Sequence, residues 1–238
     1  MIEATAKHEN VDIPVYMADW EEIHGITLCC ITLNEEKEIK EFIEYHRPYV
    51  DKVVMVDGGS KDRTVEIASP LVDDLIIRKF DGHYSNQANR CTERAKTDWI
   101  FLVDCDERAE IGLLKNLRNL INQEEVDCWG IPRKNYIDGA YDPEHFPDYQ
   151  ERLYRTYCRR IRPVHGEVVG YKKRRDLPCE DGNYFIHSKT SERHKLRNKL
   201  YSIYEMKYIN EMGEPETQNK EKFYKKYPHL SKSNFIIR

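Results

Sequence analysis

Four short apolar runs alternate with segments of helical periodicity in the first half of the chain. The runs span residues 25–34, 52–57, 74–80 and 99–104 and are rich in β-branched and aromatic residues. Apolar runs of this length predict strands that are buried on both faces. Strands that alternate with helices through short links are typical of a mostly parallel sheet covered on both sides. With right-handed crossovers, the pattern predicts an α/β, doubly wound domain.

Helical segments are expected between and after these runs. In the first, apolar side chains recur on one face, and we expect Asn34 to cap the helix and Pro48 to end it. In the second, Asp62 is the expected cap. The expected helices cover residues 34–49, 62–70, 83–97 and 111–122.

The second half of the chain has a different pattern. Residues 127–139 and 149–160 indicate mixed or antiparallel strands, and residues 188–211 indicate a helix. One face of that helix carries an apolar stripe of Leu196, Leu200, Ile203 and Tyr204. The sequence leaves open whether this stripe packs on the core, on a second subunit or on a membrane surface. We expect an N-terminal extension at residues 1–24, one domain at 25–190 and a C-terminal helical extension at 191–238.

Composition narrows the class of protein. The 238 residues carry a net charge of -4, unlike a general nucleic-acid-binding protein. We find no apolar run of the roughly 18 residues that a membrane span needs, and the N-terminal residues lack the pattern of a secretion signal. The 7 cysteines form no CxxC pair, which favours reduced thiols. We expect a cytoplasmic protein. The sequence leaves open whether it contacts a membrane peripherally and which oligomeric state it adopts.

Polar segments follow three of the four apolar runs. They read TLNEE after the first, DGGSKDRT after the second and DCDE after the fourth. Parallel sheets bind their ligands at the carboxyl ends of the strands. The three segments are therefore predicted to line one site.

Asp104 and Asp106 are the most informative of these residues. Side chains two apart on a strand point to the same side, and two carboxylates so placed repel each other unless a cation joins them. Carboxylate oxygens suit Mg²⁺ or Mn²⁺, above all when substrate phosphates complete the shell. A solvated acidic turn is the structural alternative. An aspartate-nucleophile phosphatase would instead carry DxDxT soon after the first strand.

The loop after the second run combines Asp57 with two glycines. Gly58 and Gly59 permit positive φ and close approach of a flat or phosphate-bearing ligand, and Asp57 is predicted to accept a hydrogen bond from a base or a ribose. The loop matches neither the Walker A nor the GxGxxG pattern. A tight turn before a helix is the structural reading.

These motifs, in this order, resemble glycosyltransferase family 2. The matching segments read ITLNEEKEIKEFIEYH, VVMVDGGSKDRTVEIA, SNQANRCTERAKTDWIFLVDCDE and PDYQERLYR and lie within residues 25–190. The resemblance is closest to the small soluble branch that includes lipopolysaccharide-core β-glucosyltransferase-like proteins. It implies a GT-A fold and inverting transfer of a sugar from a nucleotide-diphosphate sugar, with a UDP-sugar expected from family frequency.

The resemblance also implies roles for particular residues. The loop after the first strand would flank the nucleoside, Asp57 would contact the base or ribose, and one helix would approach the base and diphosphate. Asp104 and Asp106 would bind Mn²⁺ or Mg²⁺, with Asp106 the direct ligand. The remaining donor-binding residues are Thr32, Leu33, Asn34, Glu35, Gln87, Asn89 and Arg90. For Gln87 and Asn89 a polar helix face is the alternative.

The catalytic base is open between two residues. The branch follows its PD-Q-RLFR motif with a VHE-like segment, which is PVHGEVVG here, so that Gly166 separates the histidine from the glutamate. Glu167 is the first candidate base and Asp148 the second. His187 resembles the C-terminal histidine that many GT-A enzymes place on the metal, and a structural histidine is the alternative.

A basic stretch at residues 152–175 completes the candidate site. Arg152 and Arg155, beside the family motif, are the expected donor contacts, and the others are expected to form a solvated basic face. The positive charge of this stretch is also compatible with binding an anionic acceptor, an anionic membrane surface or DNA.

The predicted function is metal-dependent, inverting transfer of a sugar to a hydroxyl of a glycan or another acceptor. One alternative is a non-catalytic binding module that uses the basic stretch. Another is a nucleotidyltransferase, which normally carries a GxGTR-like loop that TLNEE lacks.

Overall fold

A seven-stranded mixed sheet forms the centre of the molecule. The computed structural model describes residues 4–8, 11–15, 23–144 and 146–212. The strand order is β14-β8-β11-β6-β3-β4-β5, with β6, β3, β4 and β5 mutually parallel and β11 antiparallel to both of its neighbours. The strands are β3 (Ile23–Thr32), β4 (Lys52–Asp57), β5 (Asp74–Ile77), β6 (Thr97–Leu102), β8 (Cys128–Ile131), β11 (Gln150–Arg155) and β14 (Arg174–Asp176). The predicted α/β fold with a mostly parallel sheet is confirmed.

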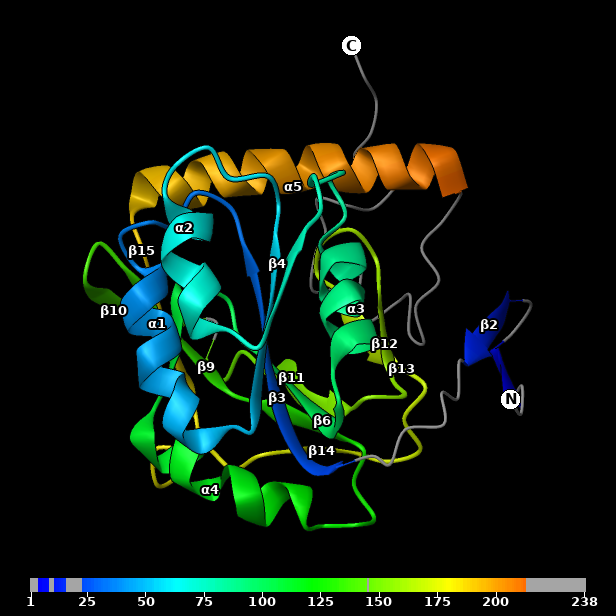
Figure 1. Cartoon of the computed structure of the whole chain (residues 1–238). Coiled ribbons are helices and arrows are strands. Elements are labelled where there is room, and N and C mark those ends of the chain that lie inside the picture. Colours follow the sequence, from blue (N-terminus) through cyan, green and yellow to red (C-terminus); the bar gives the residue numbers. More distant parts are fainter. Residues whose placement is uncertain (1–3, 9–10, 16–22, 145, 213–238) are drawn as a thin grey trace.

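Helices cover both faces of this sheet. Helices α1 and α2 lie on one side and α3 on the other, while α5 runs across the end of the sheet at which β3 and β4 finish (Figure 1). The helices are α1 (Ile39–His46), α2 (Thr64–Ala68), α3 (Tyr84–Arg94), α4 (Ile111–Ile121) and α5 (Ser191–Met212), with short 3₁₀ turns η1 (Arg47–Tyr49) and η2 (Ser69–Leu71).

The central strands are buried on both faces, as their unbroken apolar character predicts. In β3, Leu28 and Cys30 pack in the cluster that contains α1 and α4 residues, whereas Cys29 packs with Ala88 and Cys91 of α3. Successive strand residues point to opposite faces. Side chains of this one strand therefore pack in two separate hydrophobic cores, and the two cores together fix the position of its carboxyl end.

A second sheet brings distant segments to that end. Its order is β10-β9-β15-β7. β7 (Glu107–Ala109) begins at the last residue of the DCDE segment, and β15 (Phe185–Lys189) is antiparallel to it. In this pairing His187 lies opposite Glu107. The other two strands are β9 (Arg133–Ile137) and β10 (Ala140–Asp142).

Two small hairpins complete the described structure. β12 (Arg159–Ile161) pairs with β13 (Glu167–Val169), and β1 (Ala4–His8) pairs with β2 (Val11–Val15) in the predicted N-terminal extension. Residues 213–238 of the predicted C-terminal extension lie outside the described residues.

Two local expectations are wrong. Asn34 does not cap a helix: its φ is 58°, its side chain accepts a hydrogen bond from the Lys61 amide at 2.8 Å, and α1 begins only at Ile39. The third strand ends at Ile77. The chain beyond it still bonds to the neighbouring loop, through the amide of Phe80 to the carbonyl of Gly58, but without regular strand geometry.

The predicted helix near the C-terminus is present, but its buried face differs from the predicted apolar stripe. Leu196 is 59% exposed and Ile203 is 45% exposed. The inner face carries Arg197, Tyr201 and Tyr204, which contact side chains of the domain. In the described part of the chain, every helix is too short or too polar to cross a membrane.

Candidate active site

The candidate site lies where the carboxyl ends of β3, β4 and β6 meet beneath α5 (Figure 1). Register pairing places Thr32 beside Asp57, and the Thr32 hydroxyl donates to Asp57 Oδ2 at 3.2 Å. The predicted gathering of the strand ends at one edge is therefore present. Arginines and one histidine from later elements enter the same region.

Arg152 of β11 joins Asp104 to Glu107. Its Nη2 lies 2.6 Å from Asp104 Oδ2 and 2.8 Å from Glu107 Oε2. Glu107 also accepts from Arg133 at 2.6 Å. Burial would raise the pKa of Glu107, but the charges of Arg152 and Arg133 outweigh it and lower the pKa to about 2. Glu107 is therefore a buried carboxylate held between two arginines.

Asp148 belongs to the same network. Arg133 Nη2 donates to Asp148 Oδ2 at 2.6 Å, and the Gln150 amide donates to Asp148 Oδ1 at 2.8 Å. Arg133 thus connects Asp148 to Glu107. The arrangement brings the second candidate base to the network that holds Asp104.

Asp106 has different partners. The guanidinium of Arg197, from α5, donates to Asp106 Oδ2, and His187 Nε2 lies 3.3 Å from the same oxygen. Burial would raise the pKa of Asp106, but His187 and Arg197 together hold it well below its usual range. His187 is itself buried, with Nδ1 2.9 Å from the amide oxygen of Asn135. His187 and Asp106 therefore lie side by side, and the metal-ligand role of His187 stays a prediction.

Asp57 and Glu35 are tied to the loops around them. Asp57 is fully buried and accepts hydrogen bonds from the amides of Gly59 at 2.8 Å and Ser60 at 2.7 Å, so it closes its own turn. Gly59 has a φ of 97°, which favours glycine. Glu35 is buried and accepts from Arg193 of α5 at 2.7 Å. Burial raises the pKa of Glu35 and Arg193 opposes this rise.

Leu33 and Asn34 lie at the surface beside these loops. Leu33 is 44% exposed, and the amide of Asn34 donates to the Ser60 hydroxyl at 2.8 Å. Contact of this loop and of Asp57 with a nucleoside stays a prediction.

The predicted donor contacts on α3 have structural partners. Gln87 is buried and exchanges hydrogen bonds with Arg78, one to its side chain at 2.9 Å and one to its carbonyl at 2.8 Å. Asn89 makes two 2.9 Å bonds with the backbone of Arg160. Arg90 is exposed and pairs with Glu93. These bonds favour the structural reading of Gln87 and Asn89, and a donor contact stays a prediction.

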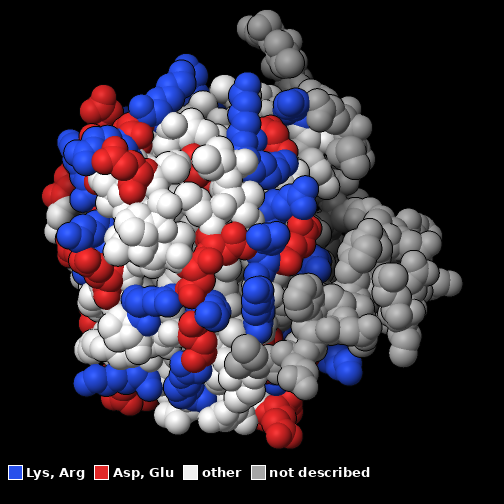
Figure 2. Space-filling view, in the orientation of Figure 1, with Lys and Arg blue, Asp and Glu red and all other residues white. Residues whose placement is uncertain are grey.

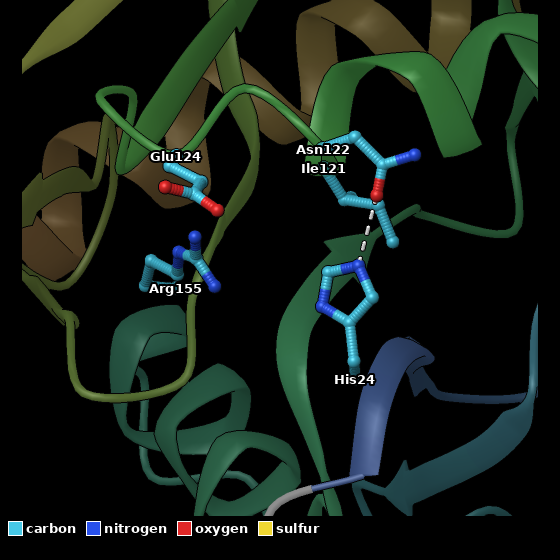
Figure 3. A pocket seen from close by; sticks show the side chains of 5 residues that line it. All are labelled: His24, Ile121, Asn122, Glu124 and Arg155. Atoms are coloured by element: carbon cyan, nitrogen blue, oxygen red, sulfur yellow. Dashed lines mark hydrogen bonds between the residues drawn. The ribbon is translucent and has the colours of Figure 1, made fainter.

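Arg155 lies at the opposite end of the strands, where β6 begins. It pairs with Asp98 at 2.6 Å and stacks over the Trp99 ring at 4.4 Å. There it lines a pocket with His24 and Asn122 (Figure 3). Because β11 runs antiparallel to β6, Arg152 and Arg155 emerge near different ends of β6. This position argues against the predicted contact of Arg155 with a donor.

Several arginines of the basic stretch are paired within the domain. Arg162 is buried and pairs with Glu205 of α5, and Arg174 pairs with Glu151 at 2.9 Å. Arg160 donates to the backbone carbonyl of Gly166 at 2.6 Å. The expected solvated basic face is therefore wrong for these three arginines, whereas Lys172, Lys173 and Arg175 are exposed. Acidic and basic side chains are interspersed over the visible surface (Figure 2).

Several site residues were missed from the sequence. They are Glu107, Arg133, Asn135, Arg193 and Arg197. Their spacing carries a signal in retrospect, since Arg133 and Asn135 are two apart on a strand and Arg193 and Arg197 four apart on a helix. Each pair therefore shares one face.

The acidic residues do not form a ready metal cage. Among the described residues, no three His, Cys, Asp or Glu side chains are grouped so as to hold an ion. Asp104 and Asp106 are held by different arginines. Asp106 and His187, however, face a common point, and their oxygen and nitrogen atoms are ligand types that Mn²⁺ accepts. These two residues fit an ion whose remaining ligands come from substrate phosphates.

The comparisons of this sequence with known proteins lead to glycosyltransferases. The family model described as Glycosyl transferase family 2 matches residues 27–175. The SPbeta prophage-derived glycosyltransferase SunS of Bacillus subtilis strain 168 is 25% identical over 175 residues, which cover 71% of this chain and 38% of SunS. An uncharacterized glycosyltransferase of Rickettsia felis is 30% identical over 128 residues, or 54% of this chain and 39% of that protein. The matched residues cover well under half the length of either relative.

A solved structure shares the fold. The crystal structure of S. aureus TarS 1-349 in complex with UDP-GlcNAc aligns with a TM-score of 0.53 at 16% sequence identity, over 78% of this chain and 66% of that chain. The likeness confirms the predicted GT-A fold.

Proposed function

The chain belongs to glycosyl transferase family 2, and from this premise we propose that it transfers a sugar from a nucleotide-diphosphate sugar to a hydroxyl of a glycan or another acceptor. One observation carries the proposal: Asp104 and Asp106 gather with Asp148 and His187, from three separate segments, at the carboxyl ends of the strands. Arg152, Arg133 and Asn135 link them in one network. A site for donor and acceptor is expected at this edge.

The donor we propose is a UDP-sugar. TarS, which shares the fold, was crystallised with UDP-GlcNAc, and this supports uridine as the nucleoside. In this chain the loop of Thr32 to Glu35 and the turn closed by Asp57 flank the proposed nucleoside position. Arg152 and Arg197 supply positive charge beside the two aspartates.

A divalent ion, Mn²⁺ or Mg²⁺, is part of the proposal. Asp106 and His187 would hold it, with the donor's phosphates completing its shell. When bound, such an ion stabilises the charge that develops on the leaving diphosphate. Arg152 keeps Asp104 and Glu107 paired, so that the carboxylates next to the ion do not repel one another.

Asp148 is the catalytic base that the geometry favours. It accepts hydrogen bonds from Arg133 and Gln150, which fix its carboxylate in the network of Asp104 and Glu107. Glu167 lies instead at the start of β13, paired with Ile161 of β12. In the proposed inverting reaction the acceptor oxygen attacks the anomeric carbon, its proton passes to Asp148, and the bond to the nucleoside diphosphate breaks.

The release of UDP from UDP-glucose and from UDP-N-acetylglucosamine tests the proposal. The assay contains Mn²⁺ and a panel of glycan acceptors. In the absence of a reactive glycan, UDP release by hydrolysis with water as the acceptor is measured. Asp106→Asn should lower turnover at least about a hundredfold, because a donor-site charge is lost. The matched control is Asp74→Asn, which changes a carboxylate of β5 that pairs with Arg94 of α3. Equal turnover in Asp106→Asn and the wild type would show that the site is assigned wrongly.

A further inference from the structure

Arg197 occupies the point at which Asp106 and His187 meet. Its guanidinium donates to Asp106 Oδ2 through one nitrogen, and its other terminal nitrogen lies 3.3 Å from His187 Nε2. The side chain of Asp106 is only 9% exposed. A cation of the protein therefore stands where the proposed divalent ion would bind.

The ring of His187 is held in place from its other side. Its Nδ1 lies 2.9 Å from the amide oxygen of Asn135. Its Nε2 lies 3.3 Å from Asp106 Oδ2 and 3.3 Å from the Arg197 guanidinium. The ring, the carboxylate and the guanidinium therefore meet at one point, and the guanidinium is the group that balances the charge of Asp106 there.

A second arginine of α5 makes the same type of contact one turn earlier. Arg193 pairs with Glu35 of the loop after β3 at 2.7 Å. Side chains four apart share one helix face. The helix therefore spans the two loops assigned to the nucleoside and the diphosphate, and it crosses the carboxyl edge of the sheet (Figure 1).

The rest of the α5 interface is polar and aromatic. Tyr201 meets Tyr84 edge-on at 5.5 Å, and Tyr204 meets Phe80 at 5.6 Å. Leu196 faces outward. Toward its C-terminal end α5 is anchored by the buried pair of Glu205 and Arg162. Around Arg197, by contrast, it is docked by ion pairs and ring edges, so this part has fewer buried apolar contacts to lose on opening than a core helix.

We propose that Arg197 is an exchangeable internal counter-ion of the donor site. Without donor it neutralises Asp106 and keeps α5 closed over the site. A divalent ion displaces it from Asp106, and its guanidinium then binds the diphosphate of the donor. This inference rests on the proposed function and makes α5 a cover whose anchor changes from Asp106 to the diphosphate when donor binds.

Mn²⁺ binding to the full chain tests the first half of the exchange. Free Mn²⁺ is measured by electron paramagnetic resonance for the wild type, Arg197→Gln and Lys199→Gln. Arg197→Gln should bind Mn²⁺ at least roughly tenfold more tightly, because the competing cation is gone. Lys199 is exposed on the same helix, so Lys199→Gln removes the same charge and should change affinity less than about twofold owing to screening.

UDP binding tests the second half. At saturating Mn²⁺, Arg197→Gln should bind UDP roughly tenfold more weakly than the wild type, since a hydrogen bond between charged groups is lost. A purely structural role would not strengthen Mn²⁺ binding while weakening UDP binding. Unchanged Mn²⁺ affinity in Arg197→Gln, or no Mn²⁺ binding by that variant, would overturn the inference.

Amide hydrogen exchange of the wild type gives a test that does not depend on a variant. Saturating Mn²⁺ should speed exchange in peptides of α5 around Arg197, because the anchor of this part on Asp106 is displaced. Unchanged protection of α5 would contradict the inference. If the wild type cleaves a UDP-sugar while α5 and Arg197→Gln show no effect, the proposed function stands and the counter-ion role fails. If no nucleotide binds or reacts, the proposed function fails.

Discussion

Arg152 and Glu107 form an ion pair of 2.8 Å between side chains that are 7% and 0% exposed. Glu107 is also paired with Arg133, and Arg152 with Asp104. The pair therefore lies at the centre of the network that positions the candidate site. Its integrity should matter for stability and for activity.

Glu107→Gln should lower the free energy of unfolding by about 3–5 kcal/mol, because two buried guanidinium groups lose their shared anion. Urea denaturation measures this change. Glu66→Gln is the matched control, since Glu66 pairs with Arg63 on the surface and should leave the denaturation midpoint unchanged. A similar midpoint for both variants would show that the buried network contributes little.

His46 should make stability fall in mild acid. Burial lowers the pKa of His46 from 6.5 to about 4, so the ring is neutral in the folded chain, with Nδ1 2.8 Å from the carbonyl of Phe42. Because the folded pKa lies below the unfolded one, the stabilisation is complete above pH 6.5 and is lost as the pH falls toward 4. At about 1.4 kcal/mol per pH unit, the loss amounts to roughly 3 kcal/mol.

His46→Asn should flatten this slope between pH 6.5 and 4, as measured by denaturation at several pH values. His24 is a useful contrast, because its hydrogen bonds to Asn122 and Asp98 raise its pKa. His24→Asn should therefore leave the slope as steep or make it steeper. An unaltered slope in His46→Asn would rule out His46 as the source.

Asp148→Asn should lower kcat by roughly 10²–10⁴-fold while UDP affinity stays close to that of the wild type, because a base acts in the chemical step. Glu167→Gln is the matched comparison and should change kcat only a few-fold. Steady-state kinetics with UDP binding measured in parallel separates the two. The reverse ranking would return the base to Glu167.

Arg155→Gln should weaken folding without affecting the donor site. Its contacts are Asp98 and the Trp99 ring at the opposite edge of the sheet. We expect a stability loss of about 1–2 kcal/mol and an unchanged dissociation constant for UDP. Arg152→Gln, by contrast, should weaken UDP binding. Equal losses of UDP affinity in both variants would contradict this placement.

The core strands could be predicted because their signal is local. The unbroken apolar run of β3 identifies a strand that is buried on both faces, and its side chains do divide between two cores. The gathering of Asp57, Asp104 and Asp106 at one edge follows from parallel pairing alone. These features need no knowledge of distant contacts.

The partners of the acidic residues could not be predicted in the same way. Arg152 reaches Asp104 because β11 inserts antiparallel between β6 and β8, a pairing that no local pattern specifies. Arg155, three residues later, emerges near the start of β6. For α5, the sequence left the partner of the apolar stripe open. Tyr204 of that stripe does face the domain, but Leu196 does not, because the ion pairs of Arg193 and Arg197 orient the helix.

Thermal melting with nucleotides tests the central claim most directly, namely that this edge of the sheet binds a nucleoside diphosphate together with a divalent ion. UDP, GDP, CDP and dTDP are each compared with and without Mn²⁺. A ligand at about a hundred times its dissociation constant adds roughly 2.7 kcal/mol, which for a chain of this size raises Tm by about 5–10 °C. We predict such a rise with UDP and Mn²⁺ together, and its loss in Asp106→Asn. No rise with any nucleotide, or an equal rise in Asp106→Asn, would contradict the account.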